Sequence, residues 1–176
     1  MVCKEYKKGI NVEFESGNLE DYKESIYSIL ESNRLLTLST IDMESSLPNV
    51  CSAFYVYDDD FNLYLWTDGD SIHSKNIKNN NLVAVNIADS NQKWGSELQG
   101  LQIKGKAFPL SILKMLKPAK LYMDRYPLVK KLIKSPQEFN TKFDSKLYKI
   151  EINWIKVFDE VRFGKEVWKK LEVKKN

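Results

Sequence analysis

The sequence predicts an α+β or mainly β fold, in which six to seven antiparallel strands form a barrel with flanking helices. Three observations lead to this prediction. Segments rich in β-branched and aromatic residues follow one another between residues 35 and 108, short polar turns join most of them, and one brief helical segment interrupts them. Strands joined by short turns pair antiparallel, whereas a parallel sheet needs a long crossover after every strand. We expect a single domain over residues 1–176.

The composition is typical of one globular domain. The chain has 176 residues, of which 43% are hydrophobic and 29% charged, and its formal net charge is +3. The lysines are interleaved with acids, so we expect no nucleic-acid partner. The longest apolar runs, such as residues 82–87, fall far short of the roughly 20 residues that cross a bilayer, so we expect no membrane association. No apolar signal core follows Met1, which favours a cytoplasmic location.

Cysteine and histidine are scarce. The chain has two cysteines, Cys3 and Cys51, and a single histidine, His73. These numbers disfavour a disulfide framework and nearly exclude a His/Cys metal cluster, so we predict no metal site. Cys51 lies within an apolar run, and we expect a small buried residue there rather than a nucleophile.

The first half of the chain predicts one helix and three strands. Residues 1–17 are polar without a clear pattern, so we predict no element there. Apolar residues recur at helical spacing from Leu19 and predict an amphipathic helix that ends near Ser32, with Asn18 as its N-cap. The next three segments predict strands in hairpin order, at residues 35–40, 49–57 and 61–67.

The second half predicts a short helix, more strands and further helices. A polar turn opens a brief helix through Ile77, and strands follow at residues 82–88 and 98–108. Beyond Pro109 the pattern is helical, with Pro118 in the first turn of a helix that ends at Tyr126. The last segments predict a clearly amphipathic strand, one further strand and a tail, at residues 147–157, 161–171 and 172–176.

The turn before the helix at residues 71–77 carries groups that bind phosphate. Thr67, Ser71 and Ser74 supply hydroxyls, the helix start supplies free N–H groups, and Lys75 supplies a positive charge. The simpler interpretation is that Asp70 or Ser71 caps the helix and that Lys75 is solvated. Two aspartates in the same turn also disfavour an anion.

His73 and a basic region each allow more than one interpretation. A lone histidine can bind phosphate, donate a proton or pack on the surface, and without a carboxylate partner it is rarely catalytic. The lysines and the arginine between residues 114 and 134 form either a solvated helical face or a site for an acidic partner or a ligand's outer phosphate.

The order of elements and several motifs resemble the pyridoxamine 5'-phosphate oxidase-like superfamily of FMN-binding split β-barrels. The resemblance covers residues 19–171. Within the superfamily the chain is most similar to a small uncharacterised branch, the YhbP-like proteins, through residues 122–127 and 162–168. The motifs that carry the wider resemblance are residues 36–40, 49–55, 63–67, 71–73 and 100–105.

The resemblance implies a cofactor, a partner and a set of site residues. Members of the superfamily are typically homodimers that bind FMN at the subunit interface. By this resemblance Thr67, Ser71 and His73 would bind the FMN phosphate, with Lys75 nearby. Two strands would line the flavin ring, the first with Asn49, Cys51, Ser52, Ala53 and Phe54, and the second with Gln102 and Lys104.

The chain departs from the oxidases at their phosphate-binding cations. The oxidases have Ser-Arg-Lys where this chain has Ser71, Ile72 and His73, and their Arg-Gln pair falls on Gln99 and Gly100. A neutral histidine and an isoleucine attract phosphate less than arginine and lysine do. The oxidases' C-terminal substrate-binding arginine pattern is also missing, so we do not expect pyridoxamine phosphate oxidation.

Three functions stay open from the sequence. The first is an FMN-dependent oxidoreductase that acts on an unidentified small substrate by hydride or electron transfer, with NAD(P)H as a candidate donor. The second is a non-catalytic dimeric module that binds a flavin, a heme or another planar ligand. The third is an interaction protein without a cofactor. The fold alone does not separate them.

Overall fold

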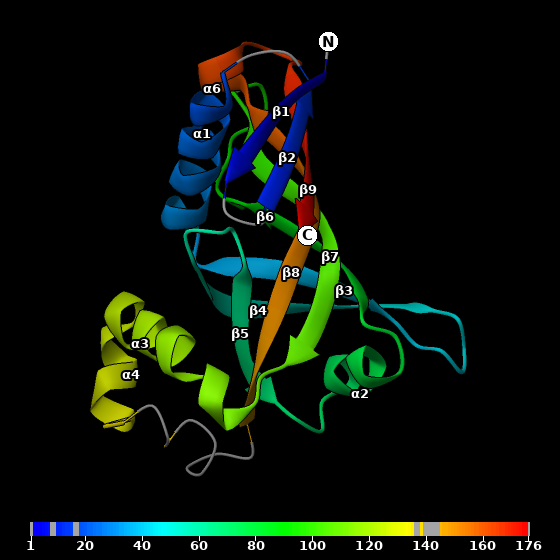
Figure 1. The fold of residues 1–176 in the computed structure, drawn as a ribbon, viewed down its shortest axis with the longest axis vertical. Helices are drawn as coiled ribbons and strands as arrows, with labels where there is room; N and C mark the ends of the chain where they lie inside the picture. Colours follow the sequence, from blue (N-terminus) through cyan, green and yellow to red (C-terminus); the bar gives the residue numbers. More distant parts are fainter. Residues whose placement is uncertain (1, 8–9, 16–17, 136–137, 139–144, 176) are drawn as a thin grey trace.

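The residues that the structure describes form one nine-stranded antiparallel sheet that closes on itself (Figure 1). The computed structural model describes the backbone of residues 2–7, 10–15, 18–135, 138 and 145–175, and the side chains of residues 18–135, 138 and 145–173. The strands are β1 (Val2–Lys7), β2 (Ile10–Glu15), β3 (Leu35–Ile41), β4 (Pro48–Tyr57), β5 (Leu63–Asp68), β6 (Leu82–Ala88), β7 (Gln99–Pro109), β8 (Ser145–Asp159) and β9 (Trp168–Lys175). The helices are α1 (Leu19–Ser32), α2 (Ile72–Asn79), the 3-10 turn η1 (Ile112–Lys114), α3 (Leu116–Arg125), α4 (Pro127–Leu132) and α6 (Glu160–Phe163).

Six of the strands make a closed barrel. The sheet order is β1-β2-β9-β8-β5-β4-β3-β6-β7, and β7 pairs again with β8. The barrel therefore consists of β8, β5, β4, β3, β6 and β7, while β9, β2 and β1 extend the sheet beyond β8. This architecture confirms the predicted antiparallel barrel with flanking helices.

The long strand β8 closes the barrel through a β-bulge. Its register with β7 shifts between Lys104 and Gly105, which pair with Trp154 and Ile152. One residue of β8 is therefore extra at this point, and a bulge of this kind bends a strand sharply. At Gly105 a side-chain carbon would clash with the carbonyl oxygen of Glu151. Close approach of two backbones thus requires glycine here.

Helix α1 packs its apolar face against the barrel. Asn18 is its N-cap, as predicted, and its side chain accepts a hydrogen bond from the backbone N–H of Glu20 at 3.1 Å. Tyr22, Ile26 and Leu30 are buried in the same core as the inward side chains of the strands. No helix of the described residues is long and apolar enough to span a membrane.

Two segments form strands that the sequence analysis did not predict. Residues 1–17 were expected to hold no element, but β1 and β2 form a hairpin that pairs with β9. The alternation of Ile10, Val12 and Phe14 with polar residues was the overlooked signal. Residues 172–175, expected to be a tail, belong to β9 and pair with β2.

The predicted strand at residues 161–171 is wrong in its first part. Asp159 caps the short helix α6, because its carboxylate accepts the backbone N–H of Arg162 at 3.2 Å. Gly164 then turns the chain with a φ of +92°, a conformation that favours glycine, and β9 begins only at Trp168. A cap and a turn residue therefore override the β-branched pattern here.

The basic region divides into solvated lysines and one structural arginine. Six lysines, at positions 114, 117, 120, 130, 131 and 134, are exposed. Arg125 instead has a side chain only 9% exposed and forms an ion pair with Glu31 at 3.0 Å. Its guanidinium also donates to the carbonyl oxygens of Leu30 and Asn33 at 2.5 and 2.6 Å. Arg125 thereby binds α3 to the C-terminal end of α1.

The Gly105→Ala variant should test the barrel closure. The added carbon would push β7 away from β8, so we expect the free energy of unfolding to fall by about 1–3 kcal/mol. Gly69→Ala is the matched control, because its added carbon would meet only the flexible side chain of Lys146, at 3.2 Å. We expect that control to stay within about 0.5 kcal/mol of the unmodified protein in urea unfolding. Equal stability of the two variants would contradict the role of Gly105.

Candidate functional site

Strands β4 and β5 separate after three residue pairs. Their ladder joins Tyr55 to Leu65, Val56 to Tyr64 and Tyr57 to Leu63. Beyond it, in the part of the chain that the structure describes, β4 pairs with β3 alone. This divergence is the split of the barrel, and the predicted site residues on β4 and β5 lie along its two sides.

The hydroxyl of Tyr122 bridges the split. It accepts a hydrogen bond from the backbone N–H of Trp66 at 2.9 Å and lies 2.8 Å from the carbonyl oxygen of Phe54, to which it donates. These are the backbone groups that the next rung of the ladder would have paired. Burial raises the pKa of Tyr122, so the hydroxyl keeps its proton. Sequence reasoning missed Tyr122, because no local pattern marks a contact 56 residues away.

Helix α2 begins beside the split. Ser71 is its N-cap and accepts the backbone N–H of Ser74 at 3.3 Å, which confirms one of the two predicted caps. The buried side chain of Asn76 donates to the hydroxyl of Thr40 at 3.1 Å. Thr40 pairs with Asn49 across β3 and β4, so α2 packs against the same end of the barrel as the first predicted ring-lining residue.

Three of the predicted phosphate-binding residues come together at this point. The Nε2 atom of His73 lies 2.8 Å from the hydroxyl oxygen of Thr67 and 2.9 Å from that of Ser71. The tautomer of His73 decides which group donates in each bond. We call Thr67, Ser71 and His73 the hydroxyl–imidazole cluster. It joins the end of β5 to the start of α2.

The cluster carries no fixed positive charge. His73 is half-buried, and this burial lowers its pKa below the ordinary value, although the carboxylate of Asp68 acts in the opposite direction. The imidazole is therefore neutral at pH 7. The cluster offers hydrogen bonds to an anion, together with the positive end of the α2 dipole, rather than an ion pair.

The predicted ring-lining residues of β4 divide between the two faces of the strand. Cys51 and Ala53 are half-buried and pack against the barrel core, and burial raises the pKa of the Cys51 thiol. Cys51 was expected to be buried and is only half-buried, and a protonated thiol agrees with the prediction that it is not a nucleophile. Ser52 and Phe54 lie on the outer face, where Phe54 is 58% exposed. Because side chains alternate along a strand, these residues cannot all line one ligand from one side.

The remaining predicted residues lie apart from the cluster. Gln102 and Lys104 line a groove of about 470 Å³ on the outer face of the sheet, where the Lys104 ammonium lies 4.9 Å from the centre of the Trp154 ring. Lys75 lines a separate open cleft of about 780 Å³ beside α2. The structure thus divides the predicted cofactor residues among several places. In the described residues, no three His, Cys, Asp or Glu side chains gather as ligands for a metal ion.

Comparison with known proteins identifies the fold. No protein-family profile and no curated sequence matches the chain. A similar solved structure is General Stress Protein 26 from Bacillus anthracis, with a TM-score of 0.57 and 22% identity over 78% of this chain and 93% of that one. The heme storage protein from Vibrio cholerae has a TM-score of 0.60 and 15% identity over 73% and 88%.

A third similar structure is a proposed pyridoxamine 5'-phosphate oxidase from Listeria innocua. Its TM-score is 0.57, with 17% identity over 77% of this chain and 97% of that one. At such identities the likeness concerns the fold. The chain has the split-barrel fold of these structures, which confirms the fold that the sequence resemblance implies.

The depressed pKa of His73 predicts a specific pH dependence. Because the folded protein holds the imidazole neutral, protonation favours the unfolded chain, whose histidine titrates near 6.5. This contribution to stability is therefore fully present above pH 6.5 and is lost as the pH falls towards the lower folded pKa. The single histidine gives one imidazole signal in NMR, so its titration is unambiguous. A midpoint below 6.5 is expected in the native protein, and a midpoint at or above the urea-unfolded value would contradict the burial argument.

Proposed function

We propose that the protein binds FMN at the split of the barrel and acts as a flavin-dependent oxidoreductase on a small substrate. The observation that carries this proposal is the hydroxyl–imidazole cluster at the start of α2, next to the diverging strands. The split-barrel fold supports it, because the sequence resemblance implies FMN binding for this fold. NAD(P)H is the proposed electron donor.

The cluster fits a phosphate through hydrogen bonds. Thr67 and Ser71 supply hydroxyl donors, His73 supplies a ring N–H, and the α2 N-terminus supplies a favourable dipole. Charge-assisted contacts would be stronger, so we expect a moderate affinity for FMN. Acidification that protonates His73 should strengthen phosphate binding, because it adds a positive charge within the cluster.

The outer face of β4 supplies groups suited to a flavin ring. FMN, when bound, supplies the hydride or electron transfer. Ser52 offers a hydroxyl and Phe54 an exposed aromatic ring on the same face of the strand. In this proposal Ser52 orients the polar edge of the ring by a hydrogen bond, and Phe54 shields the ring from water. The backbone N–H groups of β4 complete the polar lining, whereas Asn49 lies on the other face of the strand with Cys51 and Ala53.

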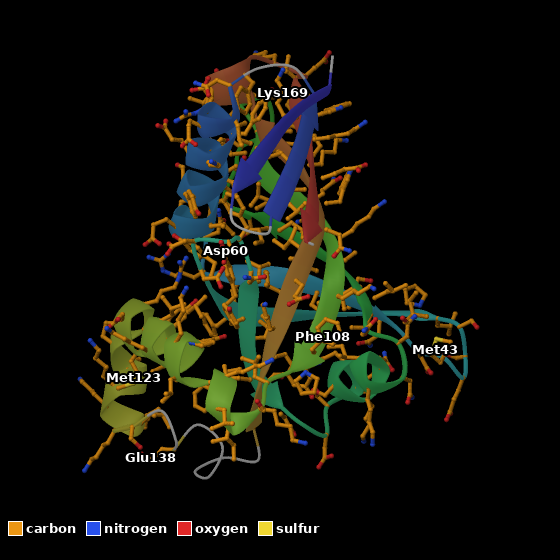
Figure 2. All side chains as sticks on the ribbon, in the orientation of Figure 1. Met43, Asp60, Phe108, Met123, Glu138 and Lys169 are labelled. Atoms are coloured by element: carbon orange, nitrogen blue, oxygen red, sulfur yellow. The ribbon has the colours of Figure 1, made fainter. Side chains whose placement is uncertain are left out.

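A second copy of the chain would cover the apolar outer face of β3 and β4. Leu35, Val50 and Phe54 are 50–60% exposed, and Leu35 pairs directly with Phe54 across the two strands. The β3–β4 hairpin also projects from the barrel, and it carries the exposed Met43 near its tip (Figure 2). Exposed apolar patches of this kind mark interaction sites in soluble proteins. We therefore propose a homodimer whose interface lies beside the FMN.

A non-catalytic module that binds a planar ligand is the second candidate. Two observations favour it. One similar structure is a heme storage protein, and the cluster lacks a fixed cation for a flavin phosphate. The two proposals differ in a measurable way, because an oxidoreductase must be reduced and reoxidised through many turnovers, whereas a module only binds.

Loss of the cluster hydroxyls should weaken FMN binding. Thr67→Val and Ser71→Ala each remove one hydrogen bond, so we expect the Kd of FMN to rise about fivefold or more in each variant. The measurement is quenching of FMN fluorescence in a titration. Ser96→Ala is the matched control, since Ser96 is exposed in the loop between β6 and β7 and its hydroxyl donates to the carbonyl oxygen of Lys93 in the same loop. Unchanged affinity in both cluster variants would contradict the proposed site.

The absorbance spectrum and solution mass of the purified protein decide between the candidates. A dimer with a flavin band that NAD(P)H reduces and an acceptor reoxidises would support the oxidoreductase. A band of heme, or flavin binding without turnover, would favour the module. A colourless protein that does not bind added FMN would contradict the oxidoreductase. His73→Ala then separates two roles, because a phosphate ligand changes the Kd alone and a catalytic group changes the reduction rate at saturating FMN.

A further inference from the structure

An open cleft lies between α2, the end of β7 and the start of β8. Its volume is about 780 Å³, within the range of small-molecule sites. Phe108, labelled in Figure 2, lies at this end of β7 close to α2. We call this site the lysine cleft and define it by Ser74, Lys75, Lys78, Phe108, Lys146 and Tyr148, which are among its lining residues.

The lysine cleft is positively charged. Lys75 and Lys78 reach it from successive turns of α2, and Lys146 reaches it from β8. Asp70 is the one carboxylate among the lining residues, so three ammonium groups face one acid. In the part of the chain that the structure describes, none of the ion pairs involves these lysines. Such a set of donors suits a dianion better than a single carboxylate.

Part of the cleft's lining, which we call the apolar floor, is formed by Ala107, Phe108 and Tyr148. Tyr148 and Ala107 are buried, and Phe108 is 36% exposed. The cavity is also much larger than a bare phosphate ion. An occupant that used both the lysines and the apolar floor would therefore carry a phosphate on an organic body, with a flat or apolar part lying against Tyr148 and Phe108.

Ser74 connects this cleft to the hydroxyl–imidazole cluster. Ser74 is a buried residue among those that line the cleft, and its hydroxyl donates to the carbonyl oxygen of Asp68 at 2.7 Å. The Ser71 hydroxyl has two acceptors within reach, the Ser74 oxygen at 2.9 Å and the same Asp68 carbonyl oxygen at 2.8 Å. The Ser71 oxygen lies 2.9 Å from Nε2 of His73. A hydroxyl has only one proton to donate. A phosphate that drew the Ser74 proton away from Asp68 would leave this carbonyl oxygen to Ser71, and would therefore change which of its neighbours Ser71 bonds.

We propose that the lysine cleft binds a small organic phosphate, and that its occupancy acts on His73 through Ser74 and Ser71. This goes beyond the proposed FMN site, because the residues that bind the ligand are different and the test contains no FMN. A ligand in the lysine cleft would then change the hydrogen bonds within the hydroxyl–imidazole cluster, which lies on the other side of α2.

The test is a titration of the FMN-free protein with phenyl phosphate, followed by calorimetry and by the NMR signal of His73. Phenyl phosphate combines the charge and the apolar body that the cleft accommodates. We expect it to bind at least tenfold more tightly than inorganic phosphate or phenol, to bind less tightly as salt rises, and to shift the His73 signal saturably. Weaker or equal binding relative to inorganic phosphate would overturn the proposed ligand class.

Two lysine substitutions test whether phenyl phosphate binds in the lysine cleft. The double variant Lys78→Gln with Lys146→Gln should raise the Kd of phenyl phosphate at least tenfold. The control Lys93→Gln alters an exposed lysine in the loop at the opposite end of β6 and should leave the Kd within twofold. Unchanged affinity in the double variant would overturn the site.

Ser74→Ala tests the coupling, because it should retain binding while it reduces the His73 shift by at least half. Binding that leaves the His73 signal unmoved in the unmodified protein would overturn the coupling. If Ser74→Ala does not fold, Ser71→Ala removes the next hydroxyl in the same connection and should reduce the shift in the same way. If the variant that folds still shows the full shift of the His73 signal, this result would also overturn the proposed coupling.

Discussion

The pairing of β7 with β8 is the constraint on which the rest of the structure depends. β8 pairs with β5 through its first residues, with β9 through its last, and with β7 along most of its length. This third pairing turns an open sheet into a barrel. Closure directs alternate side chains of six strands into one core and leaves β9 to continue the sheet towards β2 and β1. Gly105 permits it, because two backbones approach too closely there for a side chain.

The split between β4 and β5 would leave backbone groups unpaired without help from a helix. A buried N–H or carbonyl without a partner is costly. The hydroxyl of Tyr122 bonds both Trp66 and Phe54, so the strands separate without that cost. Arg125, one turn further along α3, holds the end of α1. Helix α3 therefore stabilises the split through Tyr122 and binds helix α1 through Arg125. Both contacts hold the elements around the candidate site in place.

Helix α2 serves two sites because of its own geometry. Successive residues of a helix are rotated by about 100°, so His73 and Lys75 are about 200° apart around the axis. His73 consequently bonds Thr67 beside the split, and Lys75 lines the cleft. This rotation separates the neutral hydrogen-bonding groups from the cationic ones. It explains why a turn that looks like a single phosphate cradle in the sequence becomes two distinct environments.

Local patterns determined most of the secondary structure. The helical spacing from Leu19, the caps at Asn18 and Ser71 and the alternation along β8 depend on neighbouring residues, so the sequence by itself predicted α1, α2 and the barrel strands. The resemblance to the superfamily grouped Thr67, Ser71 and His73, and the structure places them together. Only the tertiary structure decided that Tyr122 bridges the split, that the face of β4 with Cys51 turns towards the core, and that β1 and β2 extend the sheet beside β9. These outcomes depend on contacts between distant segments and on the curvature of the closed barrel, which no local pattern encodes.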